Sequence, residues 1–269
     1  MNKVALVTGA SSGIGKSTVE ELAKYGFTVY AAARRLDRLK DIDEGIPVAL
    51  DLTDDASIRD CVDYIIGQER RIDVLINNAG YGSYGAVEDV PPEEARRQFD
   101  VNVFGMARLI QLTVPYMREN HYGKIVNVSS MAGKIWTKFG GWYHAAKFAV
   151  EGLSDCLRVE LKPFGIDVII VEPGGIKTDW GAIAADNLKK TAAGGAYEEY
   201  ADKAAGVMVG LYSGNMPTKP EVIAKTIRKA VTKKRPKTRY LTGFLAKPLV
   251  LVRRIFGDRF YDFLLNIFE

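Results

Sequence analysis

Short apolar runs recur along the chain, and each has the length of a buried β-strand. They lie at residues 3–8, 27–33, 46–51, 73–78, 123–130 and 165–173. The runs do not alternate apolar with polar residues, and this continuity is typical of strands in a parallel sheet that is covered on both faces.

Stretches with the periodicity of amphipathic helices separate these runs. Examples are residues 54–69, residues 91–120 and a helix that begins near Tyr143, with one apolar stripe formed by Val150, Leu153, Leu157 and Leu161. Strands that alternate with helices predict right-handed crossovers. We therefore expect one α/β domain over residues 1–269, a doubly wound, Rossmann-type parallel sheet with helices on both faces. Such sheets bind ligands at the carboxyl ends of their strands.

Composition adds few constraints. With 47% hydrophobic and 26% charged residues, the chain has the composition of a globular protein. Cys61 and Cys156 lack the spacing of metal ligands, so no metal site is expected. The first apolar run leaves no room for a signal peptide, and no run approaches the roughly 20 apolar residues of a membrane span. These features predict a cytoplasmic protein.

Charge is distributed unevenly along the chain. The formal net charge of +4 is mild and gives no indication of a nucleic-acid partner. From residue 219 onward there are 13 Lys and Arg against 4 Asp and Glu, whereas the preceding residues have 24 against 29. A basic C-terminal part is compatible with an anionic partner or with solvated helix faces.

A glycine-rich turn, TGASSGIGKST at residues 8–18, follows the first apolar run and leads into a helix. It can hold the phosphates of a nucleoside triphosphate or the pyrophosphate of a dinucleotide, because both bind the free N–H groups of a helix N-terminus. A P-loop has four residues between its first glycine and Gly-Lys-Ser/Thr, but five separate Gly9 from Gly15. The turn alone leaves the ligand open.

Further motifs lie at the ends of the later runs. NNAG occupies residues 77–80, NVSS ends at Ser130, and EPGGIKT spans residues 172–178; Tyr143 lies thirteen residues after Ser130, with Lys147 four residues later. In this order the motifs resemble those of the short-chain dehydrogenase/reductase family, from Asn2 to about Thr178. The resemblance implies a nicotinamide dinucleotide at the glycine-rich turn, which leaves Lys16 and Ser17 as ordinary first-turn helix residues.

Tyr143 and Lys147 stand one helical turn apart, so their side chains can reach a common site. A phenol has a pKa of about 10, and a neighbouring ammonium group together with the positive nicotinamide ring lowers this value. Tyr143 can then donate a proton to a carbonyl oxygen or remove one from an alcohol. The resemblance implies that Ser130 hydrogen-bonds this oxygen, that Lys147 also holds the nicotinamide ribose, and that Asn102 anchors a water relay to the lysine.

Three nearby polar residues are not expected to be catalytic. Ser129 competes with Ser130, but the spacing to Tyr143 matches the family for Ser130. His121 and His144 are isolated histidines without a partner motif.

The end of the second apolar run indicates which nicotinamide cofactor binds. An NAD enzyme usually places an acidic residue there for the ribose hydroxyls, but this position is Ala33, followed by Arg34 and Arg35. Guanidinium groups suit a phosphate monoester, so we expect the 2′-phosphate of NADP on Arg34, with Arg35 assisting. Asp37 is expected to cap a helix. The resemblance implies adenine contacts from Asp51 and Leu52 and further cofactor contacts from Gly9, Ser11, Ser12, Gly13, Ile14, Gly15, Asn78, Ala79, Gly80, Tyr143, Lys147, Pro173, Gly174, Ile176 and Thr178.

A long connection, residues 179–218, follows the last motif, and the resemblance implies that it covers the substrate. Aromatic and methionine residues predict a broad apolar pocket: Tyr81, Tyr84, Trp136, Phe139, Trp142, Trp180, Tyr197, Tyr200, Met208 and Met216. Such a pocket predicts a lipophilic ketone or secondary alcohol as substrate. EPGGIKTDW and the basic C-terminal extension resemble bacterial relatives of steroid and retinol dehydrogenases, and a steroid- or retinoid-like substrate is expected on that resemblance. A 3-oxoacyl-thioester reductase is the alternative enzyme. A non-enzymatic NADP-sensing protein is disfavoured, because all four catalytic positions are present.

The C-terminal extension, residues 244–269, is amphipathic and basic. Apolar residues recur at steps of three or four, which predicts a helix, and Gly257 is expected to divide it: Leu249, Val252, Phe256, Phe260, Phe263 and Ile267. The segment can cover the substrate entrance, pack against a second subunit of a homo-oligomer, or lie on an anionic lipid surface.

Overall fold

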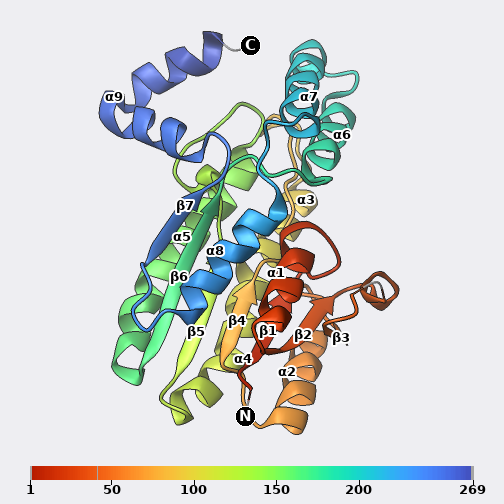
Figure 1. The fold of residues 1–269 in the computed structure, drawn as a ribbon. Coiled ribbons are helices and arrows are strands. Elements are labelled where there is room, and N and C mark those ends of the chain that lie inside the picture. Colours follow the sequence, from red (N-terminus) through yellow and green to blue (C-terminus); the bar gives the residue numbers. More distant parts are fainter. Residues whose placement is uncertain (1, 41, 268–269) are drawn as a thin grey trace.

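The computed structural model describes residues 2–40 and 42–267, so Phe268 and Glu269 of the predicted C-terminal extension lie outside the described residues. All six predicted strands form, and together with a seventh, β7 (Arg239–Thr242), they make one parallel sheet in the order β3-β2-β1-β4-β5-β6-β7 (Figure 1). The predicted doubly wound α/β fold is therefore confirmed. The strands from these six runs are β1 (Val4–Thr8), β2 (Thr28–Ala33), β3 (Ile46–Ala49), β4 (Val74–Asn77), β5 (Gly123–Val128) and β6 (Ile166–Pro173).

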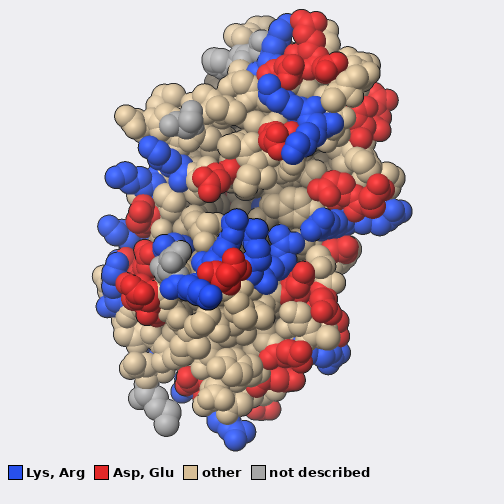
Figure 2. All heavy atoms as spheres, turned by 90° about the vertical axis from the view of Figure 1, so that its right-hand side faces the viewer, with Lys and Arg blue, Asp and Glu red and all other residues tan. Residues whose placement is uncertain are grey.

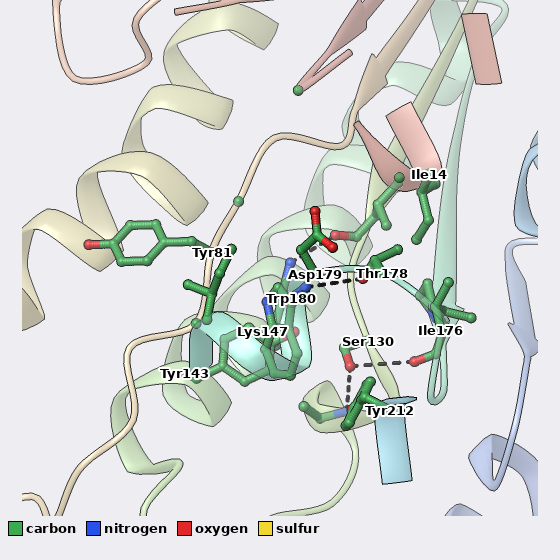
Figure 3. A pocket seen from close by; sticks show the side chains of 18 of the residues that line it. Ile14, Tyr81, Ser130, Tyr143, Lys147, Ile176, Thr178, Asp179, Trp180 and Tyr212 are labelled. Atoms are coloured by element: carbon green, nitrogen blue, oxygen red, sulfur yellow. Dashed lines mark hydrogen bonds between the residues drawn. The ribbon is translucent and has the colours of Figure 1, made fainter. Parts of the chain in front are cut away.

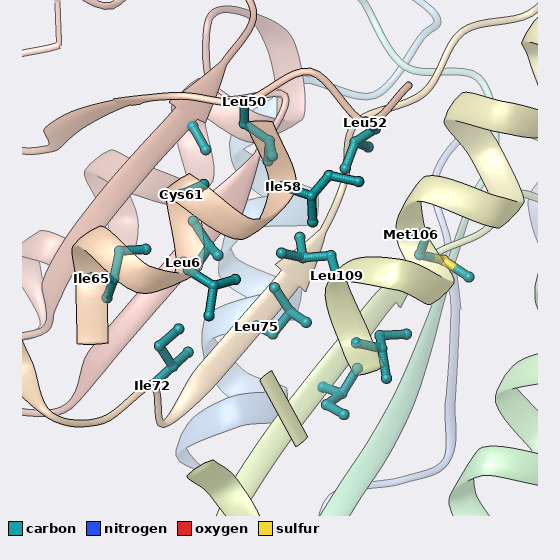
Figure 4. Close-up of a cluster of buried hydrophobic side chains, with 14 of the residues drawn as sticks. Leu6, Leu50, Leu52, Ile58, Cys61, Ile65, Ile72, Leu75, Met106 and Leu109 are labelled. Carbon is teal, nitrogen blue, oxygen red and sulfur yellow. The ribbon is translucent and has the colours of Figure 1, made fainter. Parts of the chain in front are cut away.

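Helices cover both faces of the sheet. One face packs against α1 (Gly13–Lys24) and α8 (Pro220–Thr232), and the other against α2 (Asp55–Glu69), α4 (Met106–Glu119) and α5 (Gly141–Leu161). Successive residues of a strand point to opposite faces, so alternate residues of β1 belong to different cores. Leu6 joins the core beneath α2 and α4, which Figure 4 shows, whereas Val7 joins the core beneath α1 and α8.

The two edge strands differ from the predicted pattern. Only Val48 is buried in β3, because no further strand covers this edge. At the opposite edge, β7 (Arg239–Thr242) pairs in parallel with β6, and it was not predicted. Its four residues are too few and too polar to read as an apolar run.

The predicted helix over residues 91–120 is interrupted. It consists of α3 (Pro92–Phe99), a π-helical stretch at Asp100–Gly105 and α4. A Cβ atom on Gly105 would lie 2.2 Å from the backbone oxygen of Leu52, so this residue must be small. The π-helical stretch contains the predicted site residue Asn102.

The long connection after β6 is not irregular. It contains α6 (Trp180–Ala192) and α7 (Glu198–Ser213), which pack against each other and stand beyond the carboxyl ends of the strands (Figure 1). The packing is close, since a Cβ atom on Gly181 would lie 2.5 Å from the Tyr212 side chain. These two helices were not assigned from the sequence, because a Gly-Gly pair at residues 194–195 interrupts the helical periodicity.

Two predicted helices form with differences in detail. In α5, Val150 and Leu161 are buried, but Leu153 is 37% exposed, so the stripe is narrower than predicted. The C-terminal helix α9 (Ala246–Ile267) is divided at Gly257, as predicted, where φ is +77°. Among the described residues, no helix has both the length and the apolar character to cross a membrane, and no group of three or more potential metal ligands occurs in this part of the chain.

Two alanine substitutions test the close approach at Gly105. Gly105→Ala should lower the free energy of unfolding by about 1–3 kcal/mol, because overpacking against the Leu52 backbone forces a shift. Gly152→Ala, in the exposed part of α5 with open space around its Cβ position, should raise stability by up to about 1 kcal/mol through helix propensity. Urea denaturation measures both. Equal effects of the two substitutions would contradict the packing argument.

Candidate active site

The carboxyl ends of the strands open into one large cavity of about 1770 Å³. In the orientation of Figure 1, its lower part is formed by the glycine-rich turn and the ends of the central strands, and its upper part by residues of α5, α6, α7 and α9. Of the predicted site residues, all border this cavity except Gly15 and Asn102. The sequence therefore located the cavity, and the structure assigns these two residues a place behind its wall.

The glycine-rich turn brings free backbone N–H groups to the cavity. Gly9 and Gly13 have positive φ values of +65° and +52°, which favour glycine. A Cβ atom on Gly15 would lie 2.1 Å from the backbone oxygen of Gly9, so Gly15 permits the turn rather than lining the cavity. The Ser12 side chain makes no capping hydrogen bond, and the first-turn N–H groups of α1 thus stay available for an anion.

Thr8, which sequence reasoning missed, anchors this turn to the end of β4. Its Oγ1 accepts hydrogen bonds from the backbone N–H groups of Asn78 and Ala79, both at 3.0 Å. The Asn78 amide donates in return to the backbone oxygens of Thr8 at 3.0 Å and Gly9 at 3.3 Å. Asn78 therefore supports the turn. The role of Thr8 was not predicted from the sequence, because a threonine at a strand end is common.

Tyr143, Ser130 and Lys147 converge at the centre of the cavity wall (Figure 3). Burial raises the pKa of Tyr143, and a hydrogen bond with the Ser130 side chain acts in the opposite direction. The Lys147 ammonium lies 5.8 Å from the centroid of the Tyr143 ring and donates to the backbone oxygen of Val128 at 3.0 Å. Burial lowers the pKa of Lys147 to about 8, while the charge of Glu151 opposes the shift.

The ammonium group of Lys147 and the nicotinamide ring together were expected to lower the pKa of Tyr143. Of the protein's own described groups, burial is the largest influence on this pKa and raises it. A phenol with a raised pKa is protonated at neutral pH. Tyr143 therefore keeps its phenolic proton in this structure.

Asn102 lies behind the centre of the site and is 3% exposed. Its side chain bonds the backbone of Tyr81 twice, accepting from the N–H at 3.1 Å and donating to the oxygen at 2.9 Å. A Cβ atom on Gly80 would lie 2.9 Å from Asn102 Oδ1 and 3.8 Å from Lys147 Nζ. The absence of a side chain at Gly80 therefore brings the backbone close to both.

A basic region borders the other end of the cavity. Arg34, Arg35 and Arg38 line it beyond the end of β2, and Figure 2 shows lysine and arginine side chains gathered beside a hollow in this face. Burial acts to raise the pKa of Asp51, but hydrogen bonds from Thr53 and the charge of Arg34 outweigh it and hold that pKa below its usual value. A cluster of cations suits an anionic group here.

Three further sequence predictions need comment. Asp37 lies within a short 3-10 helix, Leu36–Leu39, and does not cap it. Lys16 and Ser17 also border the cavity. His144 is buried, with Nδ1 3.0 Å from the Ala132 oxygen and Nε2 3.0 Å from the Thr137 nitrogen, so both ring nitrogens serve the local structure.

The upper part of the cavity is aromatic. The Trp180 ring lies 5.2 Å from the Tyr143 ring and 5.8 Å from the Tyr84 ring, centroid to centroid. Of the predicted apolar residues, Tyr81, Tyr84, Phe139, Trp180, Tyr200 and Met208 line the cavity. Sequence reasoning missed further lining residues, because the inner faces of the helices that hold most of them were unknown. They are Ile183, Leu211, Tyr212, Leu249, Tyr261 and Leu265, together with Leu245 in the turn before α9.

Four predicted pocket residues do not line the cavity. Trp136 packs against Tyr261, and Trp142 packs against Phe99. The remaining two are Tyr197, whose ring meets Phe139 and whose hydroxyl donates to Glu88, and Met216, which is 60% exposed.

Two buried carboxyl groups lie close behind Lys147. Glu151, one turn further along α5, and Glu172, near the end of β6, share the same two cations. Lys134 Nζ lies 2.8 Å from Glu151 and 3.7 Å from Glu172, and Arg239 lies 3.1 Å and 3.3 Å from them. Burial and the neighbouring Glu151 raise the pKa of Glu172 to about 7. This cluster was not predicted, because its members are distant along the chain.

Fold and site together define an oxidoreductase with a dinucleotide-binding sheet. A model of the short chain dehydrogenase family matches residues 3–188, and the chain belongs to that family. It is 40% identical over 200 residues to a 3-ketodihydrosphingosine reductase of Bacteroides thetaiotaomicron, covering 74% of this chain and 72% of the relative. It is 33% identical over 277 residues to an NADPH-dependent 3-dehydrocapnine reductase of Ornithobacterium rhinotracheale, covering 96% of each. The crystal structure of a short-chain dehydrogenase from Streptomyces avermitilis superposes with a TM-score of 0.76 at 36% identity, covering 89% of this chain and 87% of that one.

Glu172→Gln should remove a pH dependence of stability. The raised pKa of about 7 means that the folded protein retains a proton that the unfolded chain releases above its ordinary pKa of 4.5. The resulting stabilisation is complete below pH 4.5 and is lost as the pH rises through 7. Urea denaturation at several pH values across this window should show a steeper decline for the unmodified protein than for Glu172→Gln. Glu160→Gln, at an exposed position of α5, is the control and should keep the original decline; equal declines in all three proteins would rule out the assignment.

Proposed function

We propose that the protein is an NADPH-dependent reductase that acts on the keto group of a lipophilic molecule. The observation that carries this proposal is the position of Tyr143, a buried and protonated phenol between Ser130 and Lys147. It lies where the anion-binding part of the cavity meets the aromatic part. A proton donor at this boundary suits the reduction of a carbonyl group.

The residues present fit NADPH. The glycine-rich turn leaves N–H groups at the start of α1 for the pyrophosphate, and Arg34 and Arg35 occupy the position that suits the 2′-phosphate. The strand end itself is Ala33, so the carboxylate that an NAD enzyme usually has at this position is replaced by a small apolar side chain. The remaining residues that would hold the cofactor are Asp51, Leu52, Asn78, Ala79, Gly80, Pro173, Gly174, Ile176 and Thr178. When bound, the cofactor supplies the hydride.

The chain's own residues supply the proton and orient the substrate. Tyr143 donates its proton to the carbonyl oxygen, and the Ser130 hydroxyl donates a hydrogen bond to the same oxygen. Lys147 provides positive charge that stabilises the phenolate left behind, and it would also contact the nicotinamide ribose. Asn102 fixes the Tyr81 backbone beside this group and is the proposed anchor of the proton supply.

Two observations support a lipophilic substrate. The part of the cavity beyond Tyr143 is lined by Tyr84, Trp180 and Tyr212 together with aliphatic residues of α6 and α7, and such a surface favours an apolar ligand. In addition, two relatives are named for the reduction of 3-ketodihydrosphingosine and 3-dehydrocapnine. A steroid- or retinoid-like substrate, a homo-oligomer and a cytoplasmic location stay predictions from the sequence. A turnover panel of long-chain ketones, steroids and 3-oxoacyl thioesters, followed by NADPH absorbance, discriminates between the substrate classes.

Tyr143→Phe should lower turnover by at least about 100-fold, the usual scale for loss of a general acid. NADPH affinity should change little, because the ring stays in place. Stopped-flow turnover and a fluorescence titration with NADPH measure the two quantities. Tyr64→Phe, an exposed position on α2, is the matched control. Near-normal turnover of Tyr143→Phe would eliminate the proposed proton donor.

Arg34→Ala should weaken NADPH binding by about 1.5–3 kcal/mol, the value of a hydrogen bond to a charged group. NADH affinity should stay almost unchanged, since NADH lacks the 2′-phosphate. Titration of each cofactor against Arg34→Ala and against the exposed control Arg59→Ala gives the comparison. Equal losses for the two cofactors, or a native preference for NADH, would contradict the assignment.

A further inference from the structure

The two helical halves of α9 form an extension at the carboxyl end of the sheet, which we call the C-terminal arm (residues 246–267). In Figure 1 it stands on the side of the cavity opposite α6 and α7. Of its residues, only Ala246 and Tyr261 are buried. Nearly all of this kinked helix therefore meets either the cavity or the solvent.

The inner side of the arm is fixed to the cavity wall. Leu249, Tyr261 and Leu265 border the cavity. The Tyr261 ring packs edge-on against Trp136 with a centroid distance of 5.3 Å, and its hydroxyl donates to the Trp136 backbone oxygen at 3.3 Å. Asp262 accepts a hydrogen bond from the Trp136 indole at 2.8 Å. Through these contacts, one side of the arm lines the cavity while other residues of the arm are exposed to solvent.

The outer side of the arm is apolar and uncovered. Six large side chains are between 41% and 61% exposed: Leu251, Ile255, Phe256, Phe260, Phe263 and Ile267. Three of them form one aromatic row, with centroid distances of 4.8 Å from Phe256 to Phe260 and 6.4 Å from Phe260 to Phe263. A contiguous exposed apolar row marks an interaction site.

Charge indicates what the row contacts. Lys247, Arg254 and Arg259 are exposed and form no ion pair with any described residue. Asp258 pairs with Arg253, and Asp262 keeps its charge while it accepts the hydrogen bond from Trp136, so the four cations of the arm exceed its two carboxylates. The arm therefore presents uncompensated positive charge next to its apolar row. This combination matches an anionic lipid surface.

The opposite rim of the cavity has the same apolar character. Ile183, Tyr200 and Val207 border the cavity and are 54%, 61% and 47% exposed. They belong to α6 and α7, which stand at the same end of the molecule as the arm (Figure 1). A flat apolar surface at the end of the molecule that holds α6, α7 and the arm can thus contact both rims of the cavity at once.

We propose that the C-terminal arm docks the protein onto an anionic membrane surface, with the cavity opening toward the lipid. The aromatic row enters the region between headgroups and acyl chains, while Lys247, Arg254 and Arg259 contact lipid phosphates. A second copy of the chain is a poorer occupant, because a symmetric contact of arm with arm would bring the free cations of both copies together. Passage of a lipophilic substrate directly from the bilayer into the cavity rests on the proposed function.

Cosedimentation of the full-length protein with vesicles tests the docking. We expect sedimentation with phosphatidylglycerol–phosphatidylcholine vesicles at low salt, weaker sedimentation at high salt, and little with phosphatidylcholine alone. The double variant Phe260→Ser/Phe263→Ser should lose at least about tenfold in vesicle affinity, because two aromatic side chains no longer leave water. Arg254→Glu/Arg259→Glu should lose a similar factor with the anionic vesicles only.

Control variants replace apolar residues by serine, or an arginine by glutamate, at exposed positions away from the arm. Val159→Ser/Val222→Ser and Arg59→Glu should bind vesicles like the unmodified protein. Far-UV circular dichroism of every variant verifies an intact fold, and since vesicle binding is measured without turnover or cofactor, its result is independent of the proposed function. Absence of binding to anionic vesicles, or equal binding by arm variants and controls, would overturn the proposal. A lower mass of the Phe260→Ser/Phe263→Ser variant in sedimentation velocity, without vesicle binding, would overturn it in favour of a contact between copies.

Discussion

The pairing of β1 with β4 is the contact on which the rest of the site depends. The chain reverses its direction of winding between these two strands, so that the connections that follow them diverge and leave a crevice. Thr8 and Asn78 join the two strand ends through a reciprocal set of hydrogen bonds. That set holds the glycine-rich turn against the NNAG segment, and every other element of the cavity is placed relative to it.

Burial then determines the chemistry of the central residues. It opposes charge on both Tyr143 and Lys147, so the phenol keeps its proton and the ammonium binds its proton less tightly. Glu151 limits the effect on Lys147. The neutral phenol of Tyr143 therefore lies near the Lys147 ammonium group, whose charge is favoured by the Glu151 carboxylate one helical turn away. A sequence motif alone does not describe this arrangement.

The sequence was sufficient wherever a feature is local. Continuous apolar runs identified six strands, and the order of the glycine-rich turn, Ser130, Tyr143 and Lys147 identified the cavity. It was insufficient wherever tertiary contacts decide. The four residues of β7 become a strand only because β6 offers an unpaired edge, and Trp136 and Trp142 are drawn away from the cavity by Tyr261 and Phe99. The π-helical stretch around Asn102 likewise follows from the approach of Gly105 to Leu52, which lies in a different part of the chain.

Arg239 has a consequence for how the protein matures. It lies on the last strand and is one of the two cations that accompany the buried carboxyl groups of α5 and β6. A buried carboxylate that loses its partner is strongly destabilising, so a nascent chain that has already formed α5 still lacks the charge that completes it. The carboxylate of Glu151, on the helix that contains Tyr143 and Lys147, therefore gains its ion pair with Arg239 only when residues near 239 have left the ribosome. The last strand of the sheet to be synthesised thus completes the charge pairing beneath a site whose other residues come almost entirely from earlier segments.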